Sequence, residues 1–362
     1  MDINKRLTEL SLPDPLVMND GRRALTRDDI LLRREEIKEL LSREVYGKIP
    51  SPPDHLCVKI SDVDNSFAAG KATLYTLSFN VSFGEVESSF SVKSILPSRP
   101  GKSPAIIYLS ENGSIPDKFL PAEEISDRGY AIFVLPYSEI APYGKARRFQ
   151  DSPAKHLAKR QKNATAPGKL AMWAWGAMRV MDYLVSQTNV DKERIAVCGH
   201  GTLGIAALIA GGYDERFRYV IANCAGTLGT AISREKLGET PENLVESHPE
   251  LFSKRFAKNR IPFNKRSYDQ NFLLFLSLDR HLLIGSAQSD TRGVAEGEFL
   301  SVASLKEAIS IMNGGISLQK ITMPSVDRFA TYGRVCYHVR RGVEYFSRED
   351  WNTYLDYIDK NP

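Results

Sequence analysis

The chain has 362 residues, of which 42% are apolar, 25% charged and 9% aromatic, as in an ordinary globular protein. Its formal charge is only +4, with 48 basic against 44 acidic residues. We therefore do not expect the strongly basic surface that binds a nucleic acid. Apolar runs stay far short of the ~20 residues that cross a bilayer, so we expect no membrane span. The N-terminus lacks the apolar core of a signal peptide, which predicts a cytoplasmic protein, or an exported one whose signal has been removed. Composition does not fix an oligomeric state.

The first predicted elements are a helix and a hairpin. Residues 26–45 mix polar and apolar positions at helical spacing, and Thr26 is the expected N-cap. Residues 73–83 and 87–96 alternate with period two on either side of a glycine turn, which predicts an antiparallel hairpin.

Beyond residue 100 the pattern changes to continuous apolar runs, which are typical of strands buried on both faces. These predicted strands are residues 105–109, 130–135, 194–198, 219–223, 282–286 and 335–339. Predicted helices at residues 170–185, 205–210 and 347–358 alternate with them, the last with Ser347 as its N-cap. The order predicts an α/β fold, with a mostly parallel central sheet, an N-terminal antiparallel hairpin and helices on both faces. We expect a single domain over residues 1–362, with an N-terminal extension (1–50) and an excursion over the sheet (229–267).

The sharpest signal is the glycine-rich turn Gly199-His200-Gly201-Thr202-Leu203-Gly204, between a predicted strand and a helix of small residues. A phosphate loop is excluded because no Lys-Ser or Lys-Thr pair follows. The turn matches G-x-G-x-x-G, but residues 221–223 read Ile-Ala-Asn where a dinucleotide site needs an acidic residue, so no such cofactor is expected. The third interpretation is a nucleophile elbow, in which a strained turn lifts one side chain above the sheet. Gly201 stands at that position and has no side chain that could attack a substrate.

A metal site is not expected. The four cysteines are scattered without paired spacing, and the six histidines show neither H-x-x-x-H nor H-E-x-x-H spacing.

The stretch Gly199–Ala207 resembles the G-H-S-R-L-G-K-x-A elbow of the glucuronoyl esterases and acetyl xylan esterases, a family of α/β hydrolases. Further segments resemble that family in order from about residue 12 to residue 358. They read LPDPL (12–16), REVYG (43–47), DRGYA (127–131), WAWG (173–176), DERF (214–217), GET (238–240), GEF (297–299) and YHVR (337–340). The resemblance implies an α/β-hydrolase fold and carbohydrate-ester chemistry without a cofactor.

The resemblance also implies where the family's site residues fall on this chain. The nucleophilic serine falls on Gly201, and the following arginine, which helps to hold the oxyanion, falls on Thr202. The lysine that contacts the sugar falls on Ile205, and the general-base histidine falls on Glu344. Asp290 is the candidate acid.

Two further residues are candidates for binding a sugar. Asn271 stands where the family has the histidine of a D-Q-H segment. Trp175 could stack on a pyranose ring, although its place in an apolar helical stretch favours core packing. Basic clusters at residues 145–148 and 155–162 are interpreted as a solvated face or as contacts to an acidic sugar.

An acyl-transfer triad needs a nucleophile, a base and an acid, and the aligned positions supply neither of the first two. We therefore expect a catalytically silent member of the family that binds a carbohydrate or carboxylate ligand. The alternative is an active hydrolase of a carbohydrate ester, in which Glu344 and Asp290 activate a water molecule. A third hypothesis is a scaffolding protein that uses the hydrolase surface.

Overall fold

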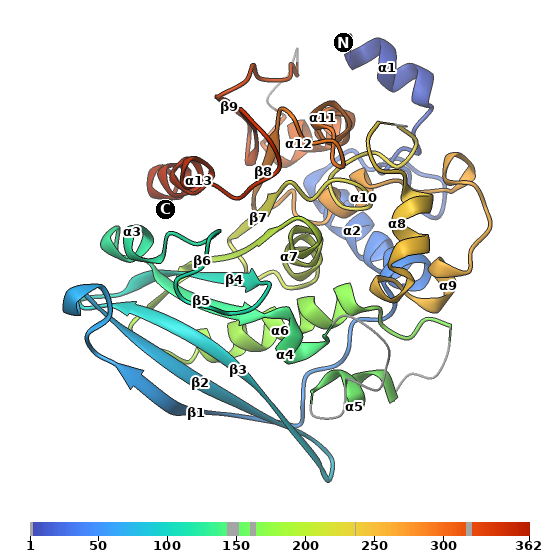
Figure 1. Ribbon diagram of the computed structural model, residues 1–362. Coiled ribbons are helices and arrows are strands. Elements are labelled where there is room, and N and C mark those ends of the chain that lie inside the picture. The colour runs from blue at the N-terminus through green and yellow to red at the C-terminus, as the bar shows by residue number, and fades with distance from the viewer. Residues whose placement is uncertain (1–2, 143–151, 160–163, 236, 316–320) are drawn as a thin grey trace.

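The computed structural model describes residues 3–142, 152–159, 164–235, 237–315 and 321–362, and within them ten strands form one mixed sheet (Figure 1). The strand order is β1-β2-β3-β5-β4-β6-β7-β8-β10-β9. Strands β4 to β8 and β10 run parallel to their neighbours in that set, whereas β1, β2, β3 and β9 pair antiparallel. The strands are β1 (His55–Asp64), β2 (Ala72–Phe83), β3 (Val86–Pro97), β4 (Ser103–Ser110), β5 (Ala131–Pro136), β6 (Val190–His200), β7 (Tyr219–Asn223), β8 (His281–Ala287), β9 (Arg328–Tyr332) and β10 (Val335–Arg340).

Helices cover both faces of this sheet, as the alternating sequence pattern predicts (Figure 1). One face packs against α3 (Ala122–Asp127) and α13 (Arg348–Lys360). The other face carries α2 (Arg27–Leu41), α6 (Lys169–Leu184), α7 (Thr202–Tyr213), α10 (Asn271–Phe275), α11 (Ala295–Ser304) and α12 (Lys306–Met312). Shorter helices are α1 (Ile3–Leu10), α4 (Tyr137–Ile140), α5 (Ala154–Lys159), α8 (Pro241–Ser247) and α9 (Lys254–Ala257). In the described part of the chain, every helix is too short or too polar to cross a bilayer.

Both predicted N-caps are confirmed. The Thr26 side chain accepts a hydrogen bond from the backbone of Asp29 at the start of α2, and the Asp29 carboxylate bonds back to the cap. Ser347 and Asp350 form the same reciprocal pair at the start of α13. Such a cap typically stabilises a helix by about 1 kcal/mol, so each fixes where its helix begins.

The structure adds strands that the sequence pattern does not predict. The N-terminal hairpin is joined by a third strand, β1, and β9 lies at the opposite edge of the sheet. Both are edge strands with mostly exposed residues, so neither shows the apolar alternation that marks a half-buried strand. The first predicted helix also ends early, because α2 passes at Leu41 into a π-helical turn, Ser42–Tyr46.

Candidate active site

The strand–turn–helix unit around Gly201 has the shape of a nucleophile elbow. Strand β6 ends at His200, α7 begins at Thr202, and Gly201 between them has φ 56° and ψ −129°, in the region that favours glycine. A Cβ atom on Gly199 would lie 2.2 Å from the backbone oxygen of Leu203, so the tight turn requires a glycine there. At Gly201, by contrast, a Cβ atom would meet a single neighbour within 4 Å, Oε1 of Glu344.

Glu344 therefore faces the place where the elbow would present a side chain. It lies in the loop after β10, and its side chain is 21% exposed. Its Oε2 accepts a short hydrogen bond from Nη2 of Arg292, which raises the pKa of that guanidinium. Its Oε1 lies 3.7 Å from Nε2 of His200. The Glu344 carboxylate is thus already engaged by a cation.

Arg340 holds the loop that carries Glu344. Its guanidinium donates hydrogen bonds at 2.6 to 3.0 Å to three backbone carbonyls of residues 341–345. Its Nε also donates to the buried carboxylate of Asp350, at 3.0 Å. The loop is therefore fixed through its backbone to the capping box of α13.

Asp290 lies in the loop after β8 and is 6% exposed. Its Oδ1 accepts hydrogen bonds from the backbone nitrogens of Arg292 at 2.8 Å and Gly293 at 3.1 Å. Burial raises the pKa of this carboxyl, and the Glu344 charge adds to the shift. Asp290 makes no hydrogen bond to His200 or Glu344, so no relay joins the three groups.

A small cavity of about 100 Å³, hereafter the elbow cavity, opens at this point. Its lining includes five residues that the sequence predicts, Gly201, Thr202, Ile205, Asp290 and Glu344. It also includes residues that the sequence argument missed, namely Glu239, Leu244, His248 and Arg292. The first three come from the excursion between β7 and β8, which includes α8 (Figure 1).

Two predicted binding residues do not reach this cavity. Trp175 is fully buried in α6 between Phe83 and Phe90, and its indole donates to the backbone oxygen of Ser51. Asn271 is fully buried at the start of α10 and is absent from the cavity lining. Neither residue lines the elbow cavity, so a role of either in binding a sugar stays a prediction. The basic cluster 145–148 lies outside the described residues, and so do residues 160–162 of the second cluster.

His200 combines a core environment with access to the site. Its ring packs against Phe119 and Phe346, and Nδ1 is hydrogen bonded to Oδ1 of Asn223 at 2.8 Å. Burial lowers the pKa of this imidazole, although the Asn223 hydrogen bond and Glu344 oppose the shift. The side of the ring that bears Nε2 faces Glu344, a contact that the sequence argument did not foresee.

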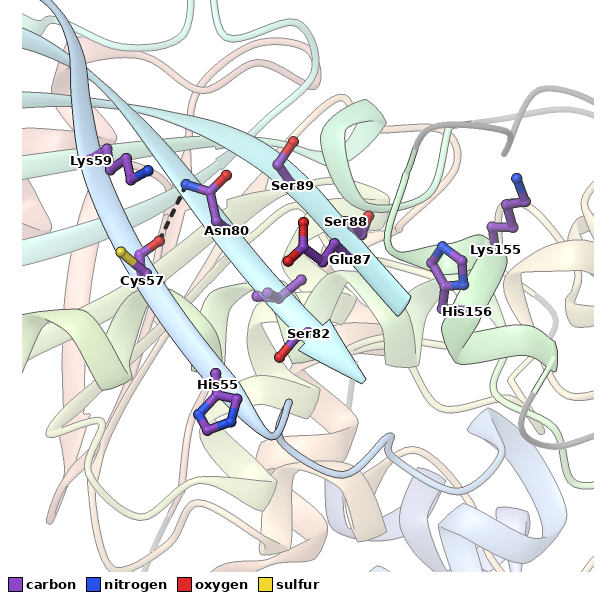
Figure 2. A pocket seen from close by; sticks show the side chains of 11 residues that line it. His55, Cys57, Lys59, Asn80, Ser82, Glu87, Ser88, Ser89, Lys155 and His156 are labelled. Atoms are coloured by element: carbon purple, nitrogen blue, oxygen red, sulfur yellow. Dashed lines mark hydrogen bonds between the residues drawn. The ribbon is translucent and has the colours of Figure 1, made fainter. Parts of the chain in front are cut away.

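Larger cavities lie elsewhere on the molecule. One of about 810 Å³ lies beside α5 on the N-terminal strands, where Figure 2 shows polar side chains such as Asn80, Ser82 and Glu87 spread along β2 and β3. Another of about 940 Å³ lies between α3 and residues 345–349. Neither includes the elbow, so volume alone does not mark the site. Within the described ranges, no three acidic, histidine or cysteine side chains are placed to hold a metal ion.

Comparison with known proteins places this fold in a family. The model of the family described as "Glucuronyl esterase, fungi" matches residues 79–304. Carbohydrate esterase MZ0003, from an unknown prokaryotic organism, is 28% identical over 98% of this chain and 90% of its own length. The 4-O-methyl-glucuronoyl methylesterase of Podospora anserina is 29% identical over 76% of this chain, which spans about half (52%) of that enzyme.

Solved structures agree with this assignment. A glucuronoyl esterase from Solibacter usitatus superposes with a TM-score of 0.87 at 27% identity, covering 96% of this chain and 97% of the other. A Sporotrichum thermophile glucuronoyl esterase in complex with methyl 4-O-methyl-β-D-glucopyranuronate shares the fold, with a TM-score of 0.74 at 22% identity and coverage of 96% and 86%. With more than half of its length matched by the family model, the chain belongs to the glucuronyl esterase family and has the α/β-hydrolase fold of its members.

Proposed function

We propose that this chain is a non-hydrolytic member of the glucuronyl esterase family that binds a carbohydrate at the elbow cavity. The observation that carries the proposal is Gly201, which occupies the elbow with no side chain and faces a carboxylate. Acyl transfer by a triad needs a nucleophile in that turn and a base that takes its proton. Gly201 has no side chain that could serve as the nucleophile. The carboxylate of Glu344, at the position of the base, already pairs with Arg292.

The expected loss of rate is large. In a serine protease, removal of either the nucleophile or the base lowers kcat by about 10⁶-fold, and the two losses do not add. The hydroxyl next to the turn position, that of Thr202, belongs to the first residue of α7. We therefore expect ester turnover close to that of buffer.

The carbohydrate part of the proposal is supported by the family. Relatives are named as glucuronoyl methylesterases, and one related structure holds a methyl glucuronate. The elbow cavity lies on the turn after β6 and is lined from the loops after β7 and β8. In open α/β sheets such loops at the carboxyl ends of strands are where ligands bind.

A second candidate function is hydrolysis by a water molecule that Glu344 activates. It is favoured by the open space at Gly201 and by the 3.7 Å between Oε1 of Glu344 and Nε2 of His200. A carboxylate that acts as general base must be free to take a proton. The ion pair with Arg292 opposes that role and leads us to place this candidate second.

The test is methanol release from a methyl glucuronate ester at high protein concentration, with wild type and Glu344→Gln compared. The proposal expects no release above buffer from either protein. Release by wild type that disappears in Glu344→Gln would overturn the proposal and establish the water mechanism. Release that survives in Glu344→Gln would also overturn it and would place the chemistry on another residue.

A further inference from the structure

One face of the three N-terminal strands is polar. The register of β1, β2 and β3 places alternate residues of these strands in rows across that face. The rows are His55, Ser82 and Glu87; then Cys57, Asn80 and Ser89; then Lys59, Ser78 and Ser91. The residues between them, such as Phe79 and Phe90, point to the opposite face and into the hydrophobic core. The polar rows therefore lie on the side of the strands that faces away from that core.

The first two rows and Lys59 line a groove of about 810 Å³, hereafter the strand groove. Lys155 and His156 of α5 line the same groove from beyond β3 (Figure 2). Cavities of about 300–1,000 Å³ are typical of sites for small ligands. Polar side chains repeat about 7 Å apart along each strand and about 5 Å apart across the sheet. A ligand with hydroxyl groups along its length can therefore find hydrogen-bond partners over several rings.

The strand groove carries cations on both of its sides. Figure 2 shows Lys59 on β1 and Lys155 on α5, with Asn80 and Glu87 on the strands between them. Among the described residues that line the groove, Glu87 is the one carboxylate. The Lys59 ammonium has no ion-pair partner within the described part of the chain. A ligand carboxylate between the two lysines would be attracted by both.

From this shape and charge we propose that the strand groove binds an oligosaccharide that carries free carboxylate groups. The side chains of Asn80, Ser82 and Ser89 form hydrogen bonds with ring hydroxyls, and Lys59 and Lys155 pair with the carboxylates. The strand groove shares no lining residue with the elbow cavity. The inference therefore goes beyond the proposed function and does not depend on it.

Two other classes of partner fit the strand groove less well. Its described lining holds no Phe, Tyr or Trp side chain on which a nucleic-acid base could stack, and its two lysines would neutralise few phosphates. A protein partner is held by buried aromatic or aliphatic anchors. Val81 is the one large aliphatic residue in the described lining, so the groove offers little to such an anchor.

The experiment compares trigalacturonate with the neutral trisaccharide in which each carboxylate is replaced by a hydroxymethyl group. Both are titrated into the full chain by calorimetry at neutral pH. We expect the acidic trisaccharide to bind about tenfold more tightly, because two exposed ion pairs contribute up to about fivefold each. The double variant Lys59→Gln/Lys155→Gln should remove this preference, and high salt should weaken it in the wild type.

The matched control is Lys192→Gln, which removes an exposed lysine from β6 and should leave the preference intact. Strand β6 is not adjacent to β1, β2 or β3, and Lys192 lies outside the groove lining. Circular dichroism establishes that each variant is folded.

Equal binding of the two trisaccharides, no binding of trigalacturonate, or a preference that survives in the double lysine variant would each overturn the inference. A preference lost in Glu344→Gln would also overturn it, because the carboxylates would then lie at the elbow cavity. Tighter binding of an oligothymidylate than of trigalacturonate, itself lost in the double lysine variant, would assign the groove to nucleic acid instead. The proposed function is judged separately by ester release, so the two can fail independently.

Discussion

Oε1 of Glu344 lies 3.5 Å from the point that a Cβ atom on residue 201 would occupy, which is an ordinary contact distance. A side chain at 201 and the side chain at 344 are therefore placed to interact across the elbow. No backbone movement is needed to bring a serine at the first position beside a histidine at the second.

The double variant Gly201→Ser/Glu344→His should consequently gain ester hydrolysis. The left-handed backbone at residue 201 costs about 1–3 kcal/mol for a serine, which a folded elbow can sustain. We expect methanol release from methyl glucuronate to rise about tenfold or more above either single variant, since both groups act as one unit. The control is Gly201→Ala/Glu344→His, which carries the same strain but no nucleophile. Equal rates for the two double variants would contradict an elbow geometry competent for catalysis.

The two glycines that flank His200 should differ in their tolerance of alanine. A Cβ atom at Gly199 would lie 2.2 Å from a backbone oxygen of Leu203, which cannot move aside without breaking the turn. At Gly201 the cost is backbone strain alone. We expect Gly199→Ala to lower the free energy of unfolding by about 3 kcal/mol or more, and Gly201→Ala by about 1–2 kcal/mol. Urea unfolding of both variants measures this, and similar losses would show that the turn relaxes at either position.

Glu298 should make stability depend on pH. It is fully buried and accepts hydrogen bonds from the backbone of Gly226 and from the hydroxyls of Thr230 and Ser286. Burial raises its pKa to about 7, from 4.5. Between these two values the folded state holds a proton that the unfolded state has lost, so the free energy of unfolding falls as pH rises from about 4.5 to about 7.

The size of this effect is at most about 3 kcal/mol over that window. It is measured as the difference between wild type and Glu298→Gln in urea unfolding across pH. The variant cannot titrate at this position, so its own curve should lack this fall. A wild-type-minus-variant difference that does not change with pH would exclude a raised pKa at Glu298.

Arg340→Lys should loosen the loop that carries Glu344. Lysine keeps the charge near Asp350 but cannot reach three carbonyls at once, so we expect a loss of about 1–3 kcal/mol. Hydrogen exchange at the amides of residues 341–346 should become faster. The control is the neighbouring Arg341→Lys, whose side chain is 75% exposed. Unchanged exchange in Arg340→Lys would mean that other contacts hold the loop.

The sequence predicts the buried part of this fold well and its edges poorly. The strands that become β4 to β8 are continuous apolar runs because both of their faces are covered. Edge strands β1 and β9 lack that signal because most of their residues are exposed to solvent and need not be apolar. Within the site, the glycine-rich motif predicts the turn residues, and the position of Asp290 shortly after a predicted strand places it at the same edge of the sheet.

Arg292 could have been found only in part from the sequence. It lies two residues after Asp290, so its place in the same loop is predictable. Its pairing with Glu344 joins segments 52 residues apart and depends on how the two loops meet. Glu239 and His248 reach the cavity from an excursion whose path no local periodicity encodes. Trp175 is a candidate by residue type, and the structure buries its side chain fully.

The anchoring of the loop by Arg340 has a consequence for how such a protein can diverge. All three carbonyl contacts and the Asp350 contact use the backbone of the loop or the arginine itself, and none uses the side chain of residue 344. These contacts therefore hold the loop without the side chain of residue 344, and the backbone of the elbow at residue 201 lies in a region that favours glycine. Selection for a folded chain alone does not preserve a reaction here. The architecture of the elbow can therefore be inherited with different side chains at positions 201 and 344.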